Sequence, residues 1–113
     1  MSFKFEKLII WQKSMDFGEK IFLISKEMLN LVSQIRRAVD SIALNISEGS
    51  ILQSTPEFKR FLGFSIRSLA EVVTCLYKSK NRNYISEEKF NELYDESYQL
   101  MNQIIGFRNQ LKD

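Results

Sequence analysis

The stretch Ser54-Thr55-Pro56-Glu57-Phe58-Lys59-Arg60-Phe61-Leu62 decides the fold, because it contains the clearest helix start in the chain. The Ser54 hydroxyl can accept a hydrogen bond from a free amide of the first turn, and Pro56 stands where a helix loses no amide bond. Glu57 completes the pattern of a capping box. The apolar residues of the stretch recur at helical spacing, so it predicts a long helix over about residues 56–80.

Three further helices are predicted on either side of this one. The chain has only four Gly and one Pro in 113 residues, which favours long helices. Apolar residues recur three and four positions apart over residues 6–28 and 31–50, and Gly49 is predicted to stop the second of these helices. Ser86 and the two acids after it predict a fourth helix that ends near residue 111. With short loops between neighbours, residues 1–113 are predicted to form one all-α domain, an antiparallel up-down-up-down four-helix bundle.

The connection between the first two helices is the weakest boundary in the sequence. Residues 26–32 contain neither Gly nor Pro, and Asn30 is the one turn-prone residue there. One interpretation is a very tight turn. The other is a continuous helix, which would require an element to be exchanged between two chains to close the bundle.

The first helix carries apolar residues on two faces, and one bundle cannot bury both. The stripe predicted to face the core consists of Leu8, Trp11, Met15, Phe22 and Leu29. The roughly opposite face, with one residue of the second helix, is predicted to be exposed and to form the interface of a homo-oligomer. The residues predicted at this interface are Ile10, Phe17, Ile21, Ile24, Met28 and Leu44.

The composition argues against most catalytic and metal sites. The chain has 16 Lys and Arg, 14 Asp and Glu, no His and a single cysteine, Cys75, which cannot build a metal-ligand set alone. We therefore expect no enzyme activity, no metal, no cofactor and no small-molecule substrate. The N-terminal residues lack the pattern of a signal peptide, and charges interrupt every apolar run, so the sequence predicts a cytoplasmic protein that does not bind membranes.

A stripe of polar residues lies beside the apolar face of the second predicted helix. Its members follow 3-4-4-3 spacing and are Gln34, Arg37, Ser41, Asn45 and Glu48. The first interpretation is a structural polar seam, in which Arg37 and Glu48 pair with groups on a facing helix. A pocket or an RNA-facing groove is the second. A catalytic role for Glu48 is the third, although no nucleophile accompanies it.

Basic residues predominate in the middle of the chain. Between residues 59 and 82 Glu71 is the single acid among six Lys and Arg, whereas acids crowd the start of the fourth predicted helix. Clustered cations bind phosphates because each neutralised phosphate releases counterions. The residues predicted to bind nucleic acid are Arg36, Arg37, Lys59, Arg60 and Arg67. The alternative is an ordinary solvated helix face.

Several segments together resemble the four-helix-bundle proteins encoded in intervening sequences of bacterial 23S rRNA genes. These segments are Trp11-Gln12-Lys13, Gln34-Ile35-Arg36-Arg37-Ala38, Ser41-Ile42, Asn45-Ile46-Ser47-Glu48-Gly49 and Glu57-Phe58-Lys59-Arg60-Phe61-Leu62, followed more loosely by Ser68-Leu69-Ala70-Glu71. Two features depart from the family pattern: the usual Phe-Pro and Gly-Leu connector before Gln34 is missing, and Ser47 replaces the usual Ala. The resemblance implies an antiparallel bundle, commonly a ring-shaped homopentamer, without an established enzymatic activity. Some relatives are accessory proteins of diversity-generating retroelements that bind a reverse transcriptase and nucleic acid.

Three functions therefore compete. The first is a non-enzymatic oligomer that binds RNA or a nucleoprotein partner through basic residues of the second and third helices. The second is a protein-only adaptor or scaffold, for example for a reverse transcriptase, that uses exposed apolar and acidic helix faces. The third is an enzyme that uses the polar stripe. RNA binding predicts a dependence on salt that a protein-only adaptor would not show.

Overall fold

Two serine caps begin the two longest helices of the computed structural model, which describes residues 1–112. Helix α3 spans Thr55–Asn81, and the Ser54 hydroxyl accepts a hydrogen bond of 3.3 Å from the Glu57 amide. Helix α4 spans Glu87–Gln110, and the Ser86 hydroxyl accepts one of 3.0 Å from the Lys89 amide. Both predicted helix starts are confirmed. The Glu57 carboxylate pairs with Arg60 at 3.2 Å instead of completing the capping box.

A tight turn joins the first two helices, as the first interpretation of residues 26–32 predicted. Helix α1 spans Ile9–Ser25, after a short 3-10 helix at Lys4–Lys7, and helix α2 spans Val32–Ser50. A second 3-10 helix, Leu29–Leu31, lies between them. Leu29 takes a positive φ of 42°, a conformation that reverses the chain and that a leucine adopts at some cost. The continuous helix is therefore not formed.

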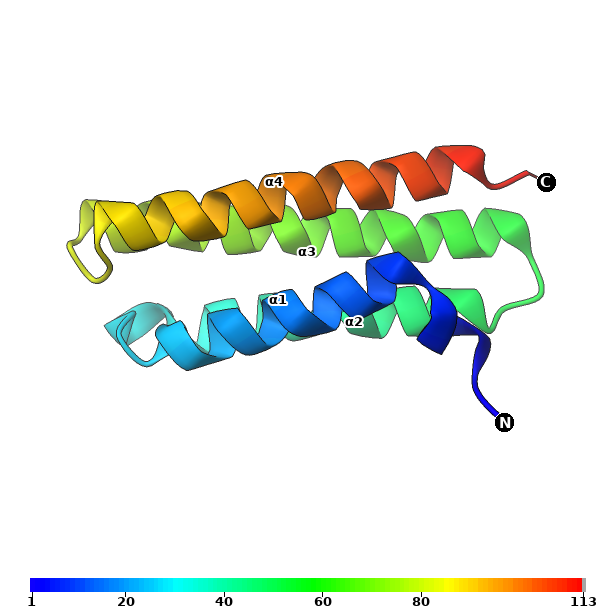
Figure 1. Ribbon diagram of the computed structural model, residues 1–113, viewed down its shortest axis with the longest axis horizontal. Helices are drawn as coiled ribbons and strands as arrows, with labels where there is room; N and C mark the ends of the chain where they lie inside the picture. Colours follow the sequence, from blue (N-terminus) through cyan, green and yellow to red (C-terminus); the bar gives the residue numbers. More distant parts are fainter. Residues whose placement is uncertain (113) are drawn as a thin grey trace.

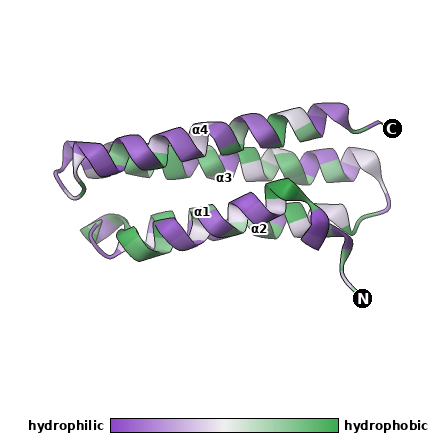
Figure 2. Cartoon of the chain, viewed as in Figure 1, coloured by the Kyte–Doolittle hydropathy of each residue, from purple (hydrophilic) through white to green (hydrophobic). Residues whose placement is uncertain are grey.

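The four helices are antiparallel and form a closed bundle (Figure 1). Helix α1 packs against α2 and α4, and α3 packs against the same two helices. The bundle measures 45 × 26 × 19 Å, and both ends of the chain lie at the same end of it. In Figure 2, hydrophilic residues predominate on the side of α4 that is turned to the viewer. The predicted fold class is confirmed.

Helices α2, α3 and α4 bury most of the residues that their spacing predicts. Helix α2 buries its whole predicted stripe, from Ile35 to Ile46. The residues that helical spacing predicts to face inward on α3 and α4 are buried or half-buried, except Ile105, which is 38% exposed. These predicted residues are Phe58, Phe61, Leu62, Leu69, Val72, Val73 and Leu76 on α3, and Phe90, Leu93, Tyr94, Met101, Ile104 and Ile105 on α4. The core of these three helices consists of Ile35, Ala38, Val39, Ile42, Ile46, Phe58, Leu62, Leu69, Val72, Cys75, Leu76, Phe90, Leu93, Leu100 and Ile104.

Helix α1 presents to the core the face that was predicted to be exposed. Ile10, Phe17, Ile21 and Met28 are buried in the core of the protomer, and Ile24 packs against it. The prediction that these five residues form an exposed oligomer interface is therefore wrong. Leu44, the sixth, is 56% exposed.

The stripe of α1 that was predicted to be buried lies largely outside the core. Phe22, Met15 and Leu29 are exposed, and Trp11 is half-buried against Phe5, with ring centroids 5.2 Å apart. Both stripes have helical spacing, so periodicity alone does not tell which one faces α2 and α4.

Gly49 acts in helix packing and does not stop the helix through a left-handed turn. It lies inside α2, and none of the glycines among the described residues has a positive φ. A Cβ atom at this position would lie 2.7 Å from the Phe61 Cβ and 2.9 Å from the Phe58 Cδ1. The glycine therefore allows α3 to approach α2 closely next to the short connection between these two helices.

Candidate nucleic-acid interface

The bundle separates its charges between two pairs of helices. Helices α2 and α3 carry seven bases, Arg36, Arg37, Lys59, Arg60, Arg67, Lys78 and Lys80, and four acids, Asp40, Glu48, Glu57 and Glu71. Helices α1 and α4 carry four bases, Lys13, Lys20, Lys89 and Arg108, and seven acids, Asp16, Glu19, Glu87, Glu88, Glu92, Asp95 and Glu96. The excess of three bases on one pair matches the excess of three acids on the other, so anionic ligands are attracted to the side of α2 and α3.

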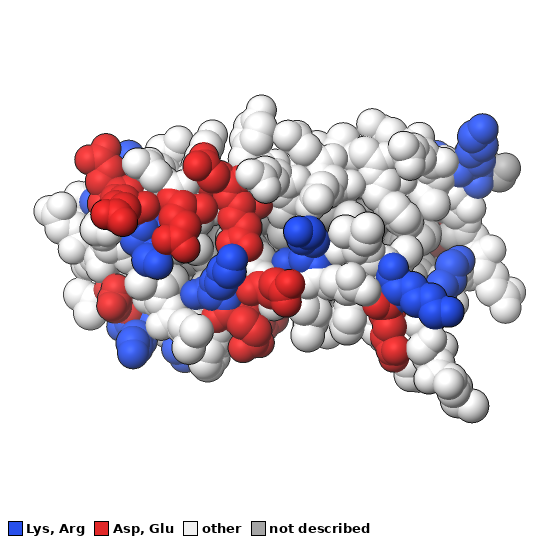
Figure 3. All heavy atoms as spheres, in the orientation of Figure 1, with Lys and Arg blue, Asp and Glu red and all other residues white. Residues whose placement is uncertain are grey.

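The acidic side is the one shown in Figure 3. Acidic side chains gather there over α1 and the first half of α4. One ion pair joins the two helices, with the Lys20 Nζ 3.0 Å from the Glu96 Oε1. The hydrogen bond that Lys20 donates to Glu96 raises the pKa of Lys20, and the charge of the same carboxylate adds to this effect. The Lys20 side chain is 54% exposed and that of Glu96 is 29% exposed, so solvent screens the pair and it contributes little to stability.

Helix α3 carries two arginines that lie over two aromatic rings on its outer side. The guanidinium carbon of Arg60 lies 5.5 Å from the ring centroid of Phe61 and 5.2 Å from that of Phe64. The guanidinium carbon of Arg67 lies 5.3 Å from the Phe64 centroid, and the two rings meet edge to face at 5.5 Å. We call these four residues, Arg60, Phe61, Phe64 and Arg67, the α3 strip. In the sequence its two half-buried aromatic rings stand between the two arginines.

A hollow of about 310 Å³ lies beside the α3 strip, between α2 and α3. Its lining residues are Asn45, Phe64, Arg67, Ser68 and Glu71. We call it the α2–α3 hollow. It contains an amide, a hydroxyl, a carboxylate, a guanidinium and an aromatic ring, which is the mixture of flat apolar surface and convergent polar groups found in ligand sites.

Three of the five residues in the predicted polar stripe lie along α3. The Gln34 Nε2 donates to the Glu71 Oε2 at 3.3 Å, and the Ser41 hydroxyl is hydrogen-bonded to that of Ser68. The Asn45 Nδ2 donates to the Ser41 carbonyl at 2.8 Å. These residues form a polar seam between two helices of one protomer, in agreement with the first interpretation.

The two charged members of the predicted stripe do not take part in the seam. Arg37 and Glu48 are exposed, and within residues 1–112 neither forms an ion pair or a side-chain hydrogen bond. The prediction that they pair with a facing helix is therefore wrong. The reason is geometric, because they lie on the solvent side of the stripe, where α3 does not reach them.

The five predicted nucleic-acid-binding bases do not form one cluster. Arg60 and Arg67 belong to the α3 strip, and Arg37 lies exposed on α2. Arg36 is held toward α1, where its Nε donates to the Ser25 hydroxyl at 2.7 Å and its guanidinium stacks 4.1 Å from the Phe22 centroid. The Lys59 carbonyl accepts a 2.9 Å hydrogen bond from Arg108 of α4.

Sequence reasoning missed the aromatic half of the α3 strip. Phe61 was assigned to the core, and Glu71 was noted only as an acid among bases. The signal was present in the spacing of Arg60, Phe64, Arg67 and Glu71, which are three or four residues apart and therefore share one face of a helix.

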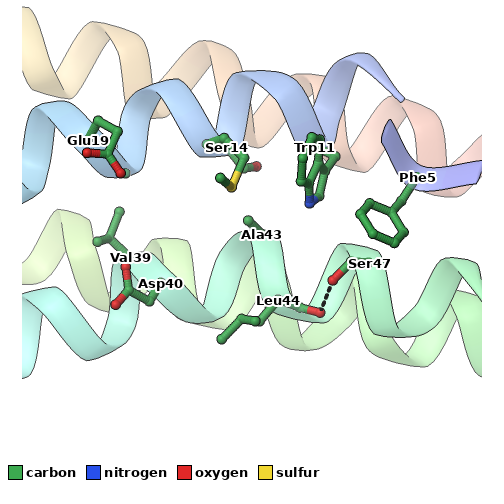
Figure 4. A pocket seen from close by; sticks show the side chains of 11 residues that line it. Phe5, Trp11, Ser14, Glu19, Val39, Asp40, Ala43, Leu44 and Ser47 are labelled. Atoms are coloured by element: carbon green, nitrogen blue, oxygen red, sulfur yellow. Dashed lines mark hydrogen bonds between the residues drawn. The ribbon is translucent and has the colours of Figure 1, made fainter. Parts of the chain in front are cut away.

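A second hollow, the α1–α2 groove, lies on the other side of α2 (Figure 4). Its volume is about 450 Å³, and its lining is mostly apolar, with Phe5, Trp11 and Ala43 among the labelled residues. The acids Glu19 and Asp40 lie at one end, and the two aromatic rings lie at the other. Leu44, the exposed member of the predicted interface, also lines this groove.

The described part of the chain offers little reactive chemistry. No group of three or more Cys, Asp or Glu side chains in residues 1–112 is arranged to hold a metal ion. Cys75 is fully buried, and this burial raises the pKa of its thiol, which keeps the thiol protonated and unreactive. None of the described helices is long and apolar enough to cross a membrane.

Comparison with known proteins identifies the family. No curated protein matches the sequence. The fold is shared with a crystal structure from Bacteroides thetaiotaomicron, a protein of unknown function from the S23 ribosomal protein family. The two chains are 24% identical with a TM-score of 0.83, over 88% of this chain and 98% of that one. The model of the 23S rRNA-intervening sequence protein family matches residues 6–106. The chain therefore belongs to the 23S rRNA-intervening sequence protein family.

Proposed function

We propose that this protein is a non-enzymatic oligomer that binds single-stranded RNA through the outer side of α2 and α3. The α3 strip carries the proposal. Single-stranded RNA is recognised by aromatic rings and guanidinium planes on which unpaired bases stack, together with cations that neutralise the phosphates. Arg60 and Arg67 supply both a planar surface and a charge beside Phe61 and Phe64.

The charges of the α3 strip are accessible to a phosphate. The Arg60 side chain is 57% exposed, and its partner Glu57 is 46% exposed. An ion pair of this kind contributes at most about 1 kcal/mol, so a phosphate can replace the carboxylate. Arg67 forms no ion pair within residues 1–112. The net positive charge of α2 and α3 adds a long-range attraction that weakens as salt is added.

Replacing both arginines of the α3 strip is expected to weaken RNA binding and to flatten its salt dependence. For Arg60→Ala/Arg67→Ala, the affinity for a labelled RNA of about 20 nucleotides should fall about 10-fold or more. The slope of log affinity against log salt should decrease by about 1.4, since each phosphate contact on a single strand contributes about 0.7. Fluorescence anisotropy at several salt concentrations measures both quantities.

The matched control removes the same charge from another surface. Lys13 and Lys26 are exposed bases of α1 and the turn after it. Lys13→Ala/Lys26→Ala should leave most of the affinity intact. Wild-type affinity in the arginine double variant, or an equal loss in the control, would remove the α3 strip from the binding surface.

The oligomer part of the proposal rests on the α1–α2 groove, for which we assign a second copy of this chain as the occupant. Leu44 at its edge and Phe22 nearby on α1 are exposed apolar residues. The acids Glu19 and Asp40 of the groove can pair with bases of the second copy that lie outside its α3 strip, and a head-to-tail contact of this kind repeats around a closed ring. A ring would also multiply the α3 strip and so raise the avidity for RNA.

A charge placed at the edge of this groove is expected to dissociate the oligomer. Light scattering after size exclusion should give the wild-type protein a mass several times 13.3 kDa, at low and at high salt. Leu44→Glu should reduce this mass to that of one protomer, because the contact would bury an unpaired carboxylate. Leu23→Glu changes an exposed leucine of α1 that does not line the groove, and should keep the mass. A monomeric wild type, or an intact Leu44→Glu oligomer, contradicts the assignment.

The acidic end of the α1–α2 groove favours a second candidate function, a protein-only adaptor. Glu19 and Asp40 lie beside apolar walls, an arrangement that suits an apolar side chain flanked by bases on a protein partner, for example a reverse transcriptase. The RNA titration separates the two functions. An adaptor of this kind would bind no RNA even at low salt.

A further inference from the structure

The α2–α3 hollow combines one acid and one base that do not neutralise each other. Arg67 and Glu71 are one helical turn apart and line the same hollow, yet they form no ion pair in the described structure. A free anion would be repelled by the Glu71 carboxylate, and an amine would be repelled by the Arg67 guanidinium. The hollow therefore suits a neutral group that donates hydrogen bonds to Glu71 on one edge. A phosphate attached to another edge of this group would lie toward Arg67.

We propose that this hollow binds a guanine base of single-stranded RNA, with Glu71 as the residue that selects it. The proposal rests on the proposed function and deepens it by naming the base that is recognised. Glu71 is half-buried and is held by the weak 3.3 Å bond from Gln34 to its Oε2. Its Oε1 accepts no hydrogen bond from residues 1–112.

A carboxylate selects guanine because it only accepts hydrogen bonds. Guanine carries two neighbouring donors, N1–H and N2–H₂, on its Watson–Crick edge. Adenine, cytosine and uracil have no two neighbouring donors on this edge, so a bidentate contact with any of them would place an acceptor lone pair against a carboxylate oxygen. Glu71 is therefore complementary to guanine alone among the four bases.

The other residues of the hollow fit the rest of a nucleotide. Phe64 offers a ring on which the base can stack, and the Arg67 guanidinium, 5.3 Å from the centroid of that ring, is positioned for the adjoining phosphate. The amide of Asn45 is fixed by its 2.8 Å bond to the Ser41 carbonyl, so this wall of the hollow is already ordered before a base enters.

The test compares uridine-rich RNA oligomers that differ at one central position. An oligomer with guanosine should bind about 10- to 100-fold more tightly than the same oligomer with adenosine, the range of a bidentate base contact. Inosine lacks the N2 amine and should lose about 10-fold, since one hydrogen bond to a charged group is removed. Glu71→Gln replaces one acceptor by a donor and should bring the guanosine and inosine oligomers close to equal affinity.

The control variant is Glu48→Gln, which makes the same charge change at an exposed position of α2 outside the hollow. It should keep the preference for guanosine. Equal affinities of the guanosine, adenosine and inosine oligomers for the wild-type protein, or an unchanged preference in Glu71→Gln, would overturn the guanine assignment while leaving RNA binding in place. Absence of binding by every oligomer would overturn the proposed function as well. If guanosine monophosphate alone bound as tightly as the oligomer, the site would serve a free nucleotide and not RNA.

Discussion

Phe17→Ala is expected to lower the free energy of unfolding by about 3–5 kcal/mol, because truncation of a fully buried ring removes its burial and leaves a cavity. Phe17 is 0% exposed and lies in the core among residues of several helices. Phe22, five positions later on the same helix, is 47% exposed. Its ring contacts the Arg36 guanidinium at the surface, so Phe22→Ala should cost only about 1 kcal/mol.

Urea denaturation followed by circular dichroism measures both variants at the same protomer concentration, since oligomerisation makes the apparent stability depend on concentration. The comparison determines which face of α1 enters the bundle. A larger loss for Phe22→Ala than for Phe17→Ala would restore the orientation predicted from the sequence, in which Phe22 faces the core.

Gly49→Ala is expected to destabilise the bundle by about 2 kcal/mol, within the range of overpacked cores. The added methyl group would lie 2.7 Å from the Phe61 Cβ and 2.9 Å from the Phe58 ring. Neither atom is the end of a flexible side chain, so α3 must shift away from α2. The gain in helix propensity, about 1 kcal/mol for Gly to Ala, does not offset the displacement of two helices.

Gly106→Ala is the matched control for this substitution. Gly106 lies inside α4, is exposed, and has no atom within 4 Å of the position of an added Cβ. The same replacement should therefore raise the unfolding free energy by about 0.5–1 kcal/mol through helix propensity. Thermal and urea unfolding of the two variants should move in opposite directions. A gain in stability for Gly49→Ala would show that α2 and α3 do not meet as closely as described.

Local features of the sequence predicted most of the fold. The Ser54 and Ser86 caps act within four residues of chain, so their hydrogen bonds form wherever the helices pack. The buried stripe of α2 was predicted because that helix has only one strongly apolar face. The scarcity of Gly and Pro predicted long helices, and the short connections predicted antiparallel neighbours.

The candidate site was predicted only in part, because its residues lie on two helices. Spacing placed Gln34, Ser41 and Asn45 on one side of α2, but it did not tell that Glu71 and Ser68 of α3 face them. The bases were identified by their charge alone. Their separation, with Arg36 stacked on Phe22 and Arg60 beside Phe64, depends on which helix packs next to each of them.

The sequence by itself determined four helices, their starts and the buried faces of α2, α3 and α4, since these follow from contacts between residues close in the chain. Only the tertiary structure decided which face of α1 is buried, because two stripes of equal periodicity compete and the packing of α2 and α4 selects Phe17 over Phe22. The role of Gly49 was also decided by the tertiary structure, because it depends on how closely α3 approaches α2. No single segment of the sequence determines this distance. Packing also brought Glu71 beside the polar residues of α2, and so created the hollow in which guanine recognition is proposed.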